Sequence, residues 1–83
     1  MTLIQRREHF TAPQLLGPAF TLTKNGRTAR CEIWSAEYGN ELRLTIDGDD
    51  FPRTQVIRDE QQFTTTVAEW MEALIAKGWT KAV

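Results

Sequence analysis

This chain of 83 residues has one histidine and one cysteine, and the spacing of its acidic residues argues against a metal site. The run Asp47-Gly48-Asp49-Asp50 has the oxygen ligands that calcium prefers. It lacks the alternating spacing and the downstream glutamate of a calcium-binding loop. Asp and Gly residues in such a run are typical of a polar hairpin turn, and we interpret it as one. The sequence therefore predicts no metal site and no cofactor.

The candidate nucleophiles are equally isolated. Cys31 is the only cysteine, and the alternation around it places it on the apolar face of a strand, beside Phe20 and Ile33. A reactive thiol needs exposure and a cationic or basic neighbour, so we expect Cys31 to be buried and inert. Ser35 and the distant His9 are not enough for a catalytic triad. We predict that the protein is not an enzyme.

The residues best suited to binding lie on the opposite face of the same strands. Arg30, Trp34 and Arg43 fall there, and aromatic and arginine side chains are favoured in protein interfaces. An aromatic ring beside arginines could also stack bases and bind phosphates. The net charge of −1 and the acidic residues on the same face weigh against nucleic acid. We expect a non-catalytic protein-interaction module, with weak nucleic-acid binding on the uncovered sheet face as the alternative.

The strands that position these residues are predicted from turn chemistry and alternation. Asn25-Gly26 is the preferred pair for a two-residue type I′ hairpin turn, and it places Phe20 opposite Cys31. The run from Glu41 to Asp47 then alternates strictly between apolar and polar residues, which predicts a third strand. If this strand pairs with the second in the simplest way, Glu32 lies opposite Arg43 on the outer face.

A fourth strand and a helix complete the predicted fold. Arg53–Arg58 is expected to lie at a sheet edge, because Pro52 has no backbone N–H to donate. Thr66 and Glu69 fit a capping box, which predicts that the helix begins at Thr66 and ends at Gly78. The fold class is therefore α+β: an antiparallel four-stranded β-meander, in the order β-β-β-β-α, with one C-terminal helix packed on one face. The helix presents an apolar stripe made of Val67, Trp70, Met71, Leu74 and Ile75.

Three segments together form a wider pattern. They are the strand residues Glu32-x-Trp34, the run Glu41-Leu42-Arg43-Leu44, and a closing helix with Trp70, Ala73-Leu74 and Lys77-Gly78-Trp79. In this pattern the chain resembles a group of small uncharacterised bacterial proteins of unknown function. The resemblance covers about residues 31–79 and implies the fold, but it brings no activity with it.

Length and composition limit the remaining possibilities. We expect residues 1–17 to form an N-terminal arm and residues 18–83 to form a single domain. The lone cysteine and the absence of a signal segment favour the cytoplasm. No apolar run approaches the roughly 20 residues that a membrane span needs. A domain this small has a low free energy of unfolding. Because it has no disulfides or metals to add stability, we expect that it gains stability by forming a homodimer.

Overall fold

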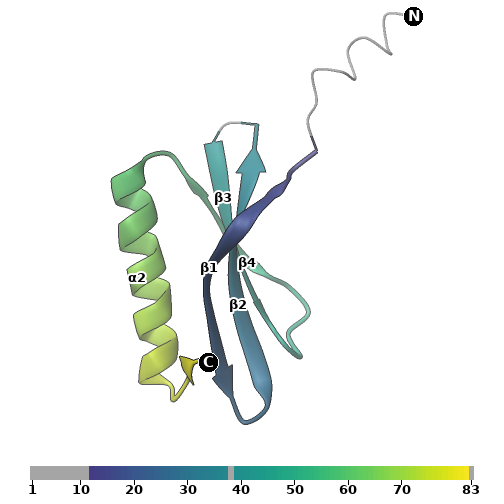
Figure 1. The fold of residues 1–83 in the computed structure, drawn as a ribbon, viewed down its shortest axis with the longest axis vertical. Helices are drawn as coiled ribbons and strands as arrows, with labels where there is room; N and C mark the ends of the chain where they lie inside the picture. Colours follow the sequence, from purple (N-terminus) through teal and green to yellow (C-terminus); the bar gives the residue numbers. More distant parts are fainter. Residues whose placement is uncertain (1–11, 38, 83) are drawn as a thin grey trace, which may run out of the picture.

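The computed structural model describes residues 12–37 and 39–82, which form one antiparallel sheet and one helix (Figure 1). The sheet has the strand order β4-β3-β2-β1-β5. The predicted α+β meander with one C-terminal helix is confirmed, and β5 is an additional strand that the sequence did not indicate. The elements are β1 (Leu15–Lys24), β2 (Arg27–Ala36), β3 (Gly39–Ile46), β4 (Arg53–Ile57), α2 (Glu60–Ala76) and β5 (Thr80–Lys81).

The predicted hairpin and its register are confirmed. Asn25 and Gly26 have φ values of 52° and 80°, the left-handed conformation that a type I′ turn requires at both positions. Phe20 lies opposite Cys31 in the β1–β2 pair. Glu32 lies opposite Arg43 in the β2–β3 pair, as expected. The turn therefore determines which side chains of three strands face α2.

The first strand extends further towards the N-terminus than expected. β1 begins at Leu15, so the expected boundary between an arm of residues 1–17 and a domain of residues 18–83 falls inside a strand. Its register is irregular between Leu15 and Gly17 and again between Pro18 and Phe20. Pro18 has no N–H to donate to the ladder, and such irregularities are found where pairing is locally interrupted. Residues 1–11, the greater part of the expected arm, lie outside the described residues.

The predicted helix start at Thr66 is wrong, because α2 begins six residues earlier, at Glu60. Asp59 is the N-cap, and its carboxylate accepts a hydrogen bond from the Gln62 amide at 2.7 Å. The Gln62 side chain in turn accepts one from the Arg58 amide at 2.8 Å. The arrangement differs from the capping box expected at Thr66 in that the second bond comes from the residue before the N-cap. The earlier start adds the turn that packs Phe63 against the core. Thr66 is instead a buried residue within the helix.

The predicted helix stop at Gly78 is confirmed and explains β5. Gly78 has a φ of 99°, and its amide donates to the Ile75 carbonyl at 3.0 Å. The Trp79 amide donates to the Leu74 carbonyl at 3.1 Å, which completes a Schellman motif. The chain is thereby turned back beside the sheet, where Thr80 pairs with Thr23. A strand of two residues is too short to show a sequence period, so it could not be predicted.

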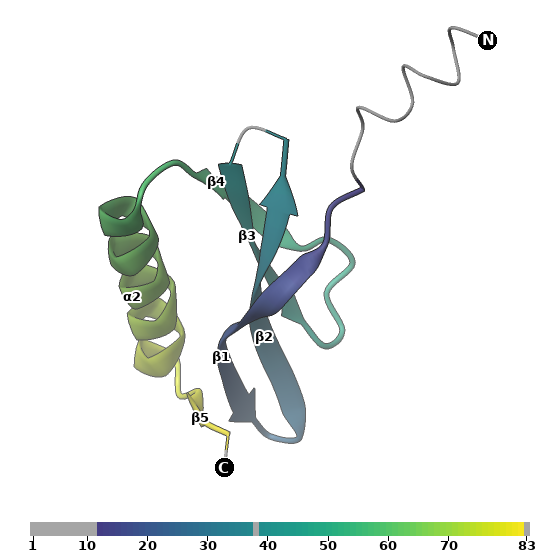
Figure 2. The ribbon, with the colours of Figure 1, turned by 45° about the horizontal axis from the view of Figure 1, so that its top comes forward.

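The core lies between α2 and the inner face of the sheet (Figures 1 and 2). Burying a large apolar side chain stabilises a fold by about 1.5–3 kcal/mol, so a few residues account for most of the stability. Ile33, Ile46 and Val67 are partly buried and pack against this core. The buried apolar residues are Phe20, Leu22, Ala29, Cys31, Leu42, Leu44, Ile57, Trp70, Leu74 and Trp79.

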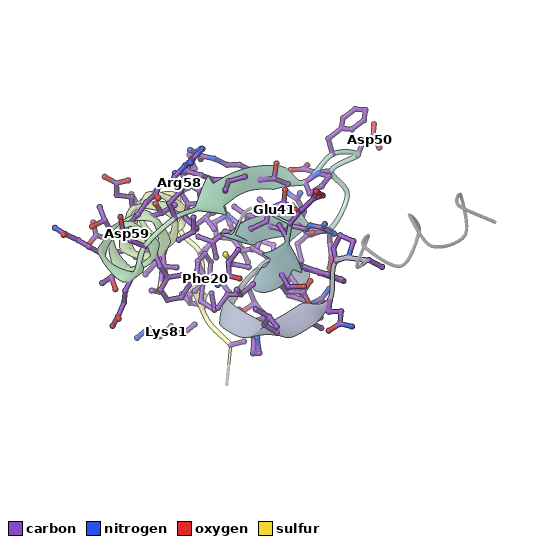
Figure 3. All side chains as sticks on the ribbon, turned by 90° about the horizontal axis from the view of Figure 1, so that it is seen from above. Phe20, Glu41, Asp50, Arg58, Asp59 and Lys81 are labelled. Atoms are coloured by element: carbon purple, nitrogen blue, oxygen red, sulfur yellow. The ribbon has the colours of Figure 1, made fainter. Side chains whose placement is uncertain are left out.

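The N-cap gives the first testable prediction. Asp59→Ala should lower the free energy of unfolding by about 1 kcal/mol, because the Gln62 amide loses its acceptor. Urea denaturation followed by circular dichroism measures the change. Asp50→Ala is the matched control, since Asp50 is exposed in the β3–β4 loop, on the side of the molecule away from Asp59 (Figure 3). Equal midpoints for the two variants would contradict the assignment of the cap.

Candidate functional site

The face of the sheet turned away from α2 consists of rows of directly opposed residues, and we call it the open face. Residues that pair directly across two strands share a face, so the register assigns each residue to one side. In order from β1 towards β4, the three central rows of the open face are Leu15, Trp34, Glu41 and Val56; Pro18, Glu32, Arg43 and Thr54; and Thr21, Arg30 and Thr45.

The structure brings two of the three predicted site residues together. The guanidinium carbon of Arg43 lies 4.5 Å from the centre of the Trp34 ring, a cation–π distance. The Nε atom of Arg43 also donates to the carboxylate of Glu41, forming an ion pair. Trp34 is half-buried, and its Nε1 atom is inaccessible and has no hydrogen-bond acceptor among the described residues. Glu41, Arg43 and Trp34 therefore form one cluster on the open face.

Arg30 lies on the same face but apart from this cluster. It is exposed on β2, opposite Thr21 and Thr45. Four residues along a strand separate it from Trp34, which is about 13 Å. Its side chain makes no hydrogen bond or ion pair with any part of the chain that the structure describes.

The cluster has a chemical consequence for nucleic-acid binding. One side of the Trp34 ring is covered by Arg43, and Arg43 is already paired with Glu41. A base would have to displace the guanidinium to stack there, and a phosphate would have to compete with the carboxylate. Arg53 faces α2 rather than the open face, because it pairs with the core residue Leu44. Of the arginines in β2, β3 and β4, Arg30 and Arg43 are therefore the ones on the open face, and Arg43 is already paired.

Cys31 is fully buried on the inner face, where the sequence placed it. Desolvation and, to a smaller extent, the nearby Glu32 carboxylate together raise the pKa of its thiol from 9.0 to about 11. The thiolate is the nucleophilic form, so a raised pKa and lack of access both suppress reactivity. These features leave Cys31 with a packing role.

The acidic run after β3 holds a turn together. The Asp47 carboxylate accepts from the Thr28 amide at 3.0 Å, and its carbonyl accepts two hydrogen bonds from the Arg27 guanidinium, at 2.9 and 2.7 Å. Asp49 forms an ion pair with the same arginine at 3.6 Å. Within residues 12–37 and 39–82, no three His, Cys, Asp or Glu side chains are grouped to hold a metal ion. The run is therefore explained by its contacts with β2.

The two remaining residues considered for catalysis were Ser35 and His9. The Ser35 hydroxyl accepts a hydrogen bond from the Gln14 amide at 2.9 Å, and the Ser35 amide donates to the Gln14 carbonyl at 2.8 Å. Ser35 therefore secures the chain just before β1. His9 lies outside the described residues.

Two hollows on the helix side of the sheet were not predicted from the sequence. One, of about 380 Å³, lies at the N-terminal end of α2 between apolar walls that include Ile57 and Phe63. Its polar rim carries charges of both signs, from Arg58, Asp59 and Glu60 (Arg58 and Asp59 are labelled in Figure 3). The other, of about 230 Å³, lies beside the C-terminal half of α2. Both arise where one helix is too narrow to cover a sheet, which no local pattern reveals.

Comparison with known proteins gives no relative from which a role could be transferred. No family model, no curated protein and no solved structure matches the chain. No helix in the described ranges is long and apolar enough to cross a membrane. The fold and the open face define a small α+β protein with one sheet face left uncovered by the described elements.

The burial of Cys31 gives the second testable prediction. At pH 8 the thiol should react with iodoacetamide at least about 100-fold more slowly in the folded protein than in urea, because a shift from 9.0 to about 11 lowers the thiolate fraction about that much. Mass spectrometry at timed intervals measures the rate. Comparable rates in the two states would show that the thiol is accessible and that its burial has been misassigned.

Proposed function

We propose that this protein is a non-catalytic interaction module of the cytoplasm that binds a second copy of itself through the open face. The observation that carries the proposal is the unequal covering of the sheet: α2 packs on one face, and no described element packs on the other. The uncovered face holds the half-buried Trp34, with Leu15 and Val56 in the same row, 51% and 41% exposed. Apolar and aromatic side chains grouped in this way favour an interface.

The charges of the open face suit a second copy. It carries two arginines, Arg30 and Arg43, and two glutamates, Glu32 and Glu41, so its formal charge is balanced. Arg30 and Glu32 are neighbours on one side of β2. A two-fold axis passing between them would bring Arg30 against Glu32 of the partner subunit, and the reverse pair would form at the same time. Such self-complementarity supports an isologous dimer over a partner of strongly acidic or basic surface.

The size of the face indicates how strong this association would be. Four strands about 4.8 Å apart and about 20 Å long present a surface on the order of 400 Å². Two copies would then bury on the order of 800 Å², which is below the roughly 1,200 Å² of stable specific complexes and in the range of weak, transient ones. We therefore expect a reversible dimer whose population depends on concentration.

The cytoplasm is the compartment that best suits the cysteine chemistry. Cys31 is the only cysteine and is buried as a free thiol, so the fold uses no disulfide. Small domains of oxidising compartments commonly gain stability from disulfides, whereas cytoplasmic ones rely on burial or association. A dimer formed through the open face would supply that additional burial.

A charge introduced into the open face tests the dimer. Val56→Glu should weaken self-association at least about tenfold, because the carboxylate must be desolvated or excluded from the interface. Ile75→Glu is the matched control: Ile75 is 45% exposed on α2, far from the open face, and its change should leave association unaltered. Sedimentation equilibrium over a range of concentrations measures both. A monomeric wild type at millimolar concentration would refute the proposal.

A charge-swap series tests the proposed geometry. Arg30→Glu and Glu32→Arg should each weaken the dimer, because like charges then meet across the two-fold axis. The double variant restores one charge of each sign and should recover most of the affinity. Failure of the double variant to recover would mean that these residues do not meet in the interface. Salt-sensitive binding of a single-stranded oligonucleotide that Arg30→Gln abolishes would instead favour the nucleic-acid alternative.

A further inference from the structure

The hollow beside the C-terminal half of α2 has the features of a small binding groove. It lies on the inner side of the sheet, separate from the open face, and has a volume of about 230 Å³. Its floor is apolar, with Leu44 and Ile46 from β3 and Trp70 and Leu74 from α2. Arg53 of β4 and Lys77 at the end of α2 also line it. Apolar surface next to cationic groups fits a ligand that carries both an apolar part and an anion.

Arg53 is stacked on a tryptophan ring and has no anionic partner among the described residues. Its guanidinium carbon lies 4.7 Å from the centre of the Trp70 ring, and Trp70 itself is only 4% exposed. This stacking does not use the N–H donors of the guanidinium. Across the described part of the chain it makes no hydrogen bond or ion pair. A planar guanidinium that is stacked on a ring and has unused donors is suited to bind a carboxylate in a bidentate manner.

Lys77 adds a second positive charge to the groove. It is the C-cap of α2, and its backbone carbonyl accepts a hydrogen bond from the Lys24 ammonium at 2.5 Å. Its own ammonium group has no partner among residues 12–37 and 39–82. Asp49, which also lines the groove, is paired with Arg27 at 3.6 Å. The charges left unpaired in the groove are therefore positive.

We propose that this groove binds the carboxyl-terminal residue of a partner polypeptide that ends in a bulky apolar side chain. The carboxylate would pair with Arg53, and the side chain would occupy the apolar floor. A volume of about 230 Å³ accommodates roughly one such side chain and is below the usual range for larger ligands. A terminal residue supplies the anion and the apolar group together, without bringing a continuing chain across the floor. This site is independent of self-association through the open face.

Short peptides provide the direct test. Acetyl-Gly-Gly-Leu with a free carboxylate should shift the NMR signals of the Arg53 Nε–H and Trp70 Nε1–H groups on titration. The same peptide with a C-terminal amide should bind at least about tenfold more weakly, because it lacks the charge-assisted hydrogen bonds. Equal affinity of the two peptides would overturn the proposal, as would shifts confined to the open face or to the hollow beside Arg58.

Variants assign the binding to the two cations. Arg53→Gln should weaken the free-acid peptide about tenfold or more. Arg58→Gln is the matched control, since Arg58 lies just beyond the other end of β4 and lines the other hollow. Because Arg53 also covers Trp70, unfolding midpoints are measured for both variants. Lys77→Gln leaves Trp70 covered and should still weaken binding. Unchanged affinity in both Arg53→Gln and Lys77→Gln would overturn the proposal.

Discussion

The Asn25–Gly26 turn is the constraint on which the rest of the structure depends. Its left-handed conformations set the register of β1 against β2, and β3 and β4 are aligned in turn on β2. A slip of one residue would exchange the two faces of a strand, moving Cys31 outwards and Trp34 inwards. The conformation of this one turn thus determines both which side chains form the core and which lie on the open face.

A second constraint is the mismatch between one helix and a five-stranded sheet. The helix buries the centre of the inner face, but the hollows at its two ends remain partly uncovered, and the outer face has no covering element among the described residues. A larger protein would cover such surfaces with a second layer of helices. Here the uncovered surfaces are the places where a partner or ligand gains most by binding.

Arginine side chains compensate in part for the missing layer. Each of the three tryptophans has an arginine guanidinium over its ring: Arg27 over Trp79 at 5.8 Å, Arg43 over Trp34 at 4.5 Å and Arg53 over Trp70 at 4.7 Å. An arginine can cover apolar surface with its stem while its charged end remains hydrated. The three differ in what their charge then does: Arg27 and Arg43 are paired with carboxylates, whereas Arg53 has no such partner in the part of the chain that the structure describes. That difference is the basis of the anion site that we propose at Arg53.

The sequence by itself determined the features that depend on local chemistry. The type I′ turn, the strict alternation of β3 and the glycine stop at Gly78 each follow from a few neighbouring residues, and they sufficed for the fold class and for placing Trp34 and Arg43 on the face opposite Cys31. The start of α2 was misplaced because two capping patterns compete, and only the packing of Phe63 decides between them. Tertiary structure alone decided three features: the pairing of β5, the stacking of Arg53 on Trp70, and the groove beside them. Each of them joins residues that are far apart in the chain, and it depends on how the helix lies against the sheet.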